Sequence, residues 1–208
     1  MAHLRLSFLG SPEVWYGQQA LTFATRKVLA LLIYLAVEEG LHPREKLATL
    51  FWPESDPVHG RGALRTTLGH LRRALDQAVP PGSQAYLVVE ADALGFHPTS
   101  DFELDVRTVG AALRAEQSGL LQEAIHLYRG DFLEGFALPD APTFDNWVSF
   151  QQEHWHHQMN VVFDRLSRWQ SAGRHFEEGI ATAVRWVAHD PLNEAAHRRL
   201  MQLHMLAG

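Results

Sequence analysis

The chain has 208 residues, of which 46% are hydrophobic, and it contains no cysteine, so disulfides, thiolate metal sites and a cysteine nucleophile are excluded. No apolar run approaches the roughly 20 residues that span a bilayer, and the first ten residues lack the pattern of a signal peptide, so we expect a cytoplasmic protein without membrane contact. The net charge of −6 is unevenly distributed: residues 1–97 hold 9 Lys/Arg and 9 Asp/Glu, and the whole excess of acids lies in residues 98–208. This split predicts two domains, 1–97 and 98–208, with different partners.

The N-terminal segment has the pattern of a small antiparallel sheet. Leu4, Leu6 and Phe8 alternate with polar residues, which is the period of a half-buried strand. A second strand is expected at residues 13–16 and a third at 20–23, with turn-forming residues between the strands. We assign this sheet a structural role.

Three helices are predicted to follow the sheet. Thr25 can cap a helix that ends near residue 40, and Pro43 suits the first turn of a second, short helix that ends near residue 52. Ser55 or Asp56 can cap a third helix over residues 57–78.

The helix over residues 57–78 is the stretch around which the rest is organised. Its leucines recur at i, i+4, i+7 and i+11 and form one narrow apolar stripe, and no acid occurs between Asp56 and Asp76. Arginines can donate to guanine edges or pair with phosphates, and the major groove admits a helix. Taken alone, the pattern favours an ordinary amphipathic helix with a solvated basic face over a DNA-reading helix, because such faces are common.

The segment after the third helix predicts a hairpin. Residues 86–90 and 94–97 read as two strands around a turn at residues 91–93. The order of sheet, three helices and hairpin is the layout of an α+β winged helix, with the third helix as reader and the hairpin as wing.

Four segments in order carry a family resemblance: LRLSFLGSPEVWYG, RKVLALLIYLAV, REKLATLFWPE and ALRTTLGHLRRAL. Together they resemble the OmpR-type winged-helix domain that opens the Streptomyces antibiotic regulatory protein (SARP) family. One departure lies in the hairpin, where the family usually has a Gly-Tyr pair and often a basic residue near the tip. Here the tip carries Asp92 and is acidic.

The second half predicts an all-α domain after a polar bridge at residues 99–105. Helices are expected at 106–117, 120–128, 147–170, 174–189 and 192–205, with a structured loop at 130–143. Two Ala-Gly pairs that close helices lie 35 residues apart, at Ala172 and Ala207, close to the tetratricopeptide spacing of about 34 residues. Residues 102–208 resemble the bacterial transcriptional activator domain, and the last repeat helix lacks a partner, so we expect the chain to continue in a longer protein.

Chemistry other than binding finds no support in the sequence. Glu153, His154, His156 and His157 invite a metal reading, but they lack the HExxH pattern and an evident further ligand cluster, so histidines on a solvated or packed helix face are preferred. No phosphate-binding loop or nucleophile elbow is present. We therefore expect no cofactor, no metal and no enzymatic activity.

The combined prediction is a sequence-specific DNA-binding transcriptional regulator, an activator in the terms of the family, that reads the major groove of double-stranded DNA with helix 57–78. Arg65, Thr66, Gly69, His70 and Arg73 are expected to face the DNA, and Arg61 and Arg72 to contact phosphates. Thr25, Arg26 and Lys27, at a helix start, are expected to hold the DNA backbone. The resemblance implies direct-repeat operators and contact with RNA polymerase. A homodimer on the DNA is expected separately, with the repeat half holding two copies together on adjacent sites. The alternative is a helical-repeat interaction module whose winged helix is a protein-binding platform.

Overall fold

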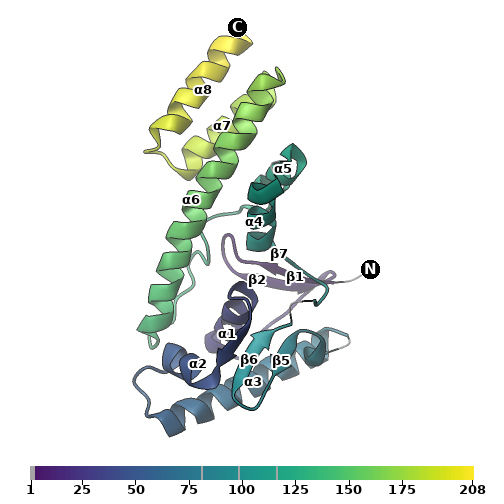
Figure 1. Cartoon of the computed structure of the whole chain (residues 1–208), viewed down its shortest axis with the longest axis vertical. Coiled ribbons are helices and arrows are strands. Elements are labelled where there is room, and N and C mark those ends of the chain that lie inside the picture. The colour runs from purple at the N-terminus through teal and green to yellow at the C-terminus, as the bar shows by residue number, and fades with distance from the viewer. Residues whose placement is uncertain (1–2, 81, 98, 116) are drawn as a thin grey trace.

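The computed structural model describes residues 3–80, 82–97, 99–115 and 117–208. The molecule is elongated, with α3 at one end, α8 at the other and the long helix α6 running between them (Figure 1). The strands are β1 (Leu4–Ser7), β2 (Glu13–Tyr16), β3 (Gln19–Ala20), β4 (Leu41–Pro43), β5 (Leu87–Val89), β6 (Ala93–Phe96) and β7 (Phe102–Leu104). The helices are α1 (Arg26–Val37), α2 (Arg44–Phe51), α3 (Pro57–Ala78), the 3-10 turn η1 (Ser83–Ala85), α4 (Asp105–Ala115), α5 (Ser118–Leu127), α6 (Pro142–Ala172), α7 (Phe176–His189) and α8 (Glu194–Ala207).

The first sheet has the strand order β3-β2-β1-β7. β1 and β2 form the predicted antiparallel pair, with Leu6 opposite Val14. The expected third strand at 20–23 is shorter and earlier, because β3 contains only Gln19 and Ala20. The expected polar bridge at 99–105 contains strand β7, which lies parallel to β1 and buries Leu104 beside it. A strand from the second half of the chain therefore completes the sheet of the first half.

The three predicted N-terminal helices are present. The Thr25 hydroxyl accepts a hydrogen bond from the amide of Val28 and caps α1, and the Asp56 carboxylate accepts from two amides at the start of α3. Pro43 is not in the first turn of α2, because it ends strand β4 and serves as the residue before the helix. The leucines of α3 at 64, 68, 71 and 75 are all buried, as their spacing predicts.

The predicted hairpin is formed by β5 and β6, and the short strand β4 joins it to make the order β4-β6-β5. Gly95 of β6 lies so close to β4 that a Cβ there would come within 2.5 Å of the carbonyl oxygen of Gly40. Only glycine fits this approach, which brings the start of α2 next to the hairpin.

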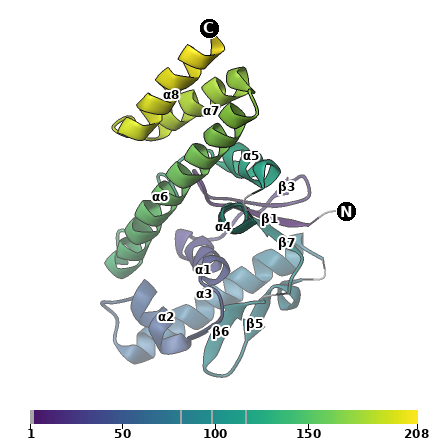
Figure 2. The same ribbon diagram turned by 45° about the horizontal axis from the view of Figure 1, so that its top comes forward.

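The helices of the second half pack in sequence, with α4 against α5, α5 against α6, α6 against α7 and α7 against α8 (Figure 2). α6 begins at Pro142, inside the segment expected to be a loop, and its first turns pack on the N-terminal half. There the ring of Phe144 lies 5.2 Å from that of Phe51, and the ring of Trp147 lies 5.1 Å from that of Tyr34. One helix thus contributes to the packing of both halves.

Asp105 joins the two halves at a buried position. Its Oδ2 accepts hydrogen bonds from the amides of Phe8 at 2.6 Å and Leu9 at 2.7 Å, and its Oδ1 accepts one from Val106. Burial raises the pKa of Asp105 to about 6, against the opposing effect of these amides. The predicted boundary between residues 97 and 98 falls beside this junction, and Pro98 lies outside the described residues.

The segment 128–141 also contacts the N-terminal half next to Asp105, at residues 8–10. Gly10 has a φ of 114°, and a Cβ there would lie 3.0 Å from the Cβ of Arg129, so this contact requires glycine. Leu133 donates its amide to the carbonyl of Phe8 at 2.8 Å. Within the part of the chain that the structure describes, no helix is long and apolar enough to cross a membrane.

Candidate nucleic-acid interface

The exposed side of α3 carries the residues that the leucine spacing places opposite the core. Arg61, Arg65, Thr66, Gly69, Arg72 and Arg73 are exposed, and His70 is half-buried. Gly69 has open space around its Cα, since a Cβ built there meets nothing within 4 Å. The helix lies along the end of the molecule that is farthest from α8, so its outer face is not covered by the helical half (Figures 1 and 2).

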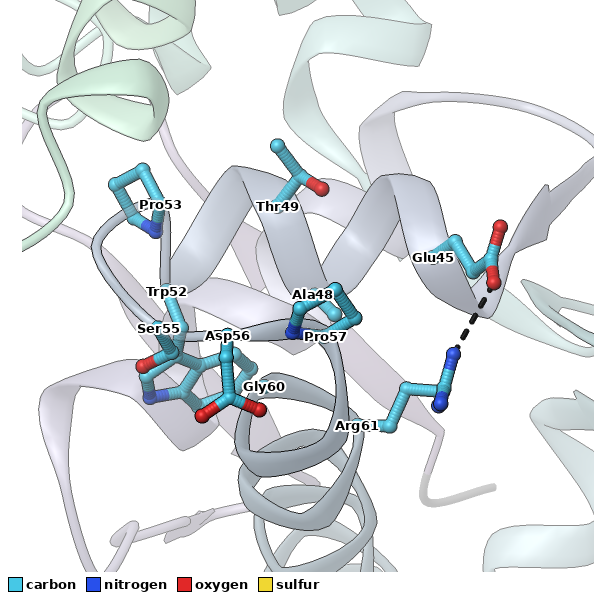
Figure 3. Close-up of a pocket in the computed structure, with 10 residues that line it drawn as sticks. All are labelled: Glu45, Ala48, Thr49, Trp52, Pro53, Ser55, Asp56, Pro57, Gly60 and Arg61. Atoms are coloured by element: carbon cyan, nitrogen blue, oxygen red, sulfur yellow. Dashed lines mark hydrogen bonds and ion pairs between the residues drawn. The ribbon is translucent and has the colours of Figure 1, made fainter.

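The arginines of this face differ in how they are held. Arg65 and Arg73 make no hydrogen bond or ion pair with any described residue. Arg72 interacts with Asp76 only through the long-range attraction of their charges. Arg61 is paired with Glu45 of α2, with 3.2 Å between its Nη1 and the carboxylate oxygen (Figure 3). Arg65 and Arg73 are therefore the guanidinium groups most readily offered to a ligand.

A further arginine joins this face from another element. Arg44, the first residue of α2, lines a surface depression of 330 Å³ together with Arg61 and Arg65. Its guanidinium also donates to the carbonyl of Glu90 in the hairpin, at 2.9 Å and 3.3 Å. Sequence spacing could not group Arg44 with α3, because only the folded chain brings α2, α3 and the hairpin together.

Acidic residues flank the basic face at two places. The turn between α2 and α3 surrounds a pocket of 210 Å³ lined by Glu45, Trp52, Asp56 and neighbouring residues (Figure 3). Hydrogen bonds from His59 and Val58 lower the pKa of Asp56, which keeps this carboxylate charged. The hairpin tip exposes Glu90 and Asp92. The basic surface therefore consists of Arg44 and the part of α3 that begins at Arg61.

Arg26 and Lys27 at the start of α1, which are expected to hold the DNA backbone, both make contacts within the protein. The ammonium group of Lys27 pairs with Asp140 at 2.8 Å and lies over the ring of Trp52, and its side chain is only 15% exposed. The guanidinium of Arg26 lies over the ring of Phe136. The segment 130–141 uses both cations as contacts between the two halves, while Thr25 is used as a helix cap.

The chain thus combines a sheet, three helices and a hairpin, with arginines on the third helix, and an array of further helices. Residues 99–208 match the family model of the bacterial transcriptional activator domain, and the chain belongs to this family. The resemblance to the SARP-type activators is thereby confirmed.

Two curated relatives are similar over nearly the whole chain. The regulatory protein AfsR of Streptomyces griseus is 28% identical over 208 residues, which is 98% of this chain and 20% of that protein. AfsR of Streptomyces coelicolor is 28% identical over 216 residues, with the same two shares. The chain thus spans about one fifth of the length of these relatives.

One solved structure has the same fold. Mycobacterium tuberculosis EmbR, in complex with a low-affinity phosphopeptide, superposes with a TM-score of 0.71 over all of this chain and 56% of EmbR. The sequence identity is 19%, so the likeness concerns the fold: small sheets and many helices in a similar arrangement.

Proposed function

We propose that this protein binds double-stranded DNA in a sequence-specific manner through α3 and activates transcription. The observation that carries the proposal is the outer face of α3. Its guanidinium groups at Arg65 and Arg73 are exposed and unpaired, while the leucine stripe on the opposite side of the helix is buried. A helix of this kind can enter a major groove, and its arginines can donate two hydrogen bonds to a guanine.

The residues divide by their expected contacts. Arg65 and Arg73 reach base edges, Thr66 and His70 lie beside them, and Gly69 lets the helix approach the bases closely. Arg61, Arg72 and the newly grouped Arg44 contact phosphates, which requires Arg61 to leave Glu45 for a stronger anion.

The helical half is proposed to contact protein rather than DNA. It holds the whole net negative charge, which repels phosphates, and its helices α6, α7 and α8 pack in sequence with a spacing close to that of tetratricopeptide repeats. Contact with RNA polymerase and direct-repeat operators follow from the family resemblance and belong to the same proposal, as does a homodimer on the DNA.

The test is selection of bound DNA from a random library with the whole chain, followed by affinity measurements on the selected site. Enrichment of one motif is expected for the wild type, and its loss for the folded double variant Arg65→Ala/Arg73→Ala. Arg198→Ala is the matched control, because Arg198 is exposed on α8 and likewise makes no hydrogen bond or ion pair with a described residue. An enriched motif that the double variant binds with wild-type affinity would remove α3 from the reading role.

A second function, that of a protein-binding platform without DNA affinity, is favoured by the acidic tip of the hairpin, where Glu90 and Asp92 are exposed. Retention on heparin and on random DNA at low salt separates the two functions. A platform elutes with the void volume, whereas a DNA-binding protein is retained and elutes as salt rises, because counterions compete for the phosphates.

A further inference from the structure

Away from α3, three metal-ligating side chains meet where the segment after α5 lies against α6 and α7. They are Asp131, His156 and His189, and one ligand atom from each lies within 4.8 Å of the others. We propose that these three residues form a binding site for a divalent transition-metal ion such as Zn²⁺. Imidazole nitrogens and a carboxylate oxygen are a common ligand set for this ion.

The separation of His156 and Asp131 fits two ligands on one ion better than a direct bond. The Nδ1 of His156 lies 3.6 Å from the Oδ1 of Asp131, which is too long for a hydrogen bond. Two ligand atoms that lie about 2.0–2.1 Å from a tetrahedral Zn²⁺ are separated by about 3.3 Å. A shift of a few tenths of an ångström brings the pair to that distance.

His189 presents its Nδ1 lone pair to the same place. Its Nε2 lies 3.2 Å from the carbonyl oxygen of His156, and because a carbonyl only accepts, the proton is on Nε2. The Tyr128 hydroxyl lies 2.7 Å from Nδ1 of His189 and 3.3 Å from Oδ1 of Asp131, so both ligand atoms point to one spot. Because the phenolic oxygen is fixed to its ring, the whole Tyr128 side chain has to shift when the ion binds at this spot.

The surroundings of His156 resemble those of metal-bound histidines. Its second nitrogen, Nε2, faces the carboxylate of Asp190 at 3.6 Å, so a shift of a few tenths of an ångström is needed before this nitrogen can donate a hydrogen bond to it. Asp190 in turn accepts hydrogen bonds from the side-chain amides of Asn160 at 3.0 Å and Asn193 at 3.1 Å, which fix its position. A carboxylate behind the imidazole orients the ring and makes it a better ligand.

The site is open enough for an ion and a water molecule. Asp131, His189 and Tyr128 line a cavity of 390 Å³. Two arginines also line it, but Arg185 donates to the carbonyl of Ile125, and Arg129 donates to that of Ser7 and pairs with Glu13. With water as the fourth ligand, the ion would hold α6, α7 and the start of the 130–141 segment together.

The experiment is isothermal titration of the untagged, EDTA-treated chain with ZnCl₂. We expect one ion per chain and a higher melting temperature in its presence. His156→Ala and Asp131→Asn should each weaken binding by roughly tenfold or more, and Asp190→Asn by roughly tenfold. His157→Ala is the matched control, since His157 is the exposed neighbour on α6 outside the cluster.

Two features keep the test decisive. His189 packs against Tyr128 and Phe163, so its replacement can disturb folding, whereas the His156 side chain is 37% exposed and its removal should leave the circular dichroism unchanged. Imidazole NMR should show Zn²⁺ on the Nδ1 atoms of His156 and His189. Absence of 1:1 binding, wild-type affinity in folded His156→Ala, or an equal loss in His157→Ala would each overturn the site.

Discussion

The helices at the two ends of the molecule, α3 and α8, are both amphipathic but differ in which face is left open. In α3 the leucine stripe is covered and the open face carries arginines. In α8 only Ala196 and Leu203 are buried, while Met201, Met205 and Leu206 are exposed, Met205 at 83%. The covered apolar side and charged open side of α3 suit a polyanion, and the apolar open side of α8 suits a protein.

The largest difference between α3 and α8 is expected in how much a truncated apolar side chain lowers the free energy of unfolding. Leu68, in the middle of the stripe, is buried, so Leu68→Ala should lower the free energy of unfolding by about 2–5 kcal/mol. Met205→Ala on α8 should change it by less than about 0.5 kcal/mol. Urea unfolding of both variants measures the difference, and equal small effects would show that α3 is not packed as described.

The junction between the halves should show a pH dependence through Asp105. Its raised pKa means that the folded protein holds this proton more tightly than the unfolded chain. The resulting stabilisation is complete below the unfolded pKa of 3.8 and is lost as the pH rises through about 6. Between pH 7 and pH 4 the wild type should gain roughly 2–3 kcal/mol relative to Asp105→Asn, which has no such proton.

Urea unfolding of both proteins across this pH range makes the measurement. A constant difference between them would show that Asp105 has the same pKa in the folded and unfolded chain.

The charged face of α3 should act on binding and not on stability. Arg65→Ala and Arg73→Ala should each cost about 1–3 kcal/mol of affinity for the selected DNA site, with the melting temperature unchanged, because neither side chain bonds to a described residue. Arg198→Ala on α8 should leave the affinity as it is. Fluorescence anisotropy at fixed salt provides the comparison, and equal losses for all three variants would indicate a general charge effect.

The smallest effect is expected at Lys27. Its pair with the exposed Asp140 should contribute less than about 1 kcal/mol, so Lys27→Ala should lower stability slightly. DNA affinity at the selected site should not change, because the ammonium is used between the halves. A loss of affinity comparable to that of Arg65→Ala would restore Lys27 to the DNA interface.

The sequence predicted those parts of the fold whose signals are local. The bounds of α3 follow from the Asp56 cap and the leucine period, and both lie within the helix or directly beside it. The strands β4 and β7 were missed because each has three residues and is defined by a partner far along the chain. The same reason explains why Pro43 was placed in a helix.

The candidate site shows the same limit. The exposed arginines of α3 could be derived from helical spacing, but Arg44 joins them only through the packing of α2 and the hairpin. The pairing of Lys27 could not be predicted, because its acidic partner, Asp140, lies in a segment 113 residues later in the chain. Asp131, His156 and His189 come from three separate segments of the chain. A search of the sequence for closely spaced metal ligands therefore includes His156, in the run 153–157, but neither of its two partners.

The parallel pairing of β7 with β1 has a consequence for how the chain folds during synthesis. The Phe8 amide and the Asp105 carboxylate that receives it are separated by 97 residues. At roughly 5–20 residues per second, a ribosome needs about 5–20 s to deliver the second partner after the first. Until β7 is made, the nascent first sheet has an open edge at β1, and α3 is synthesised within this interval. The arginine-bearing helix is therefore synthesised before the strand that completes the first sheet.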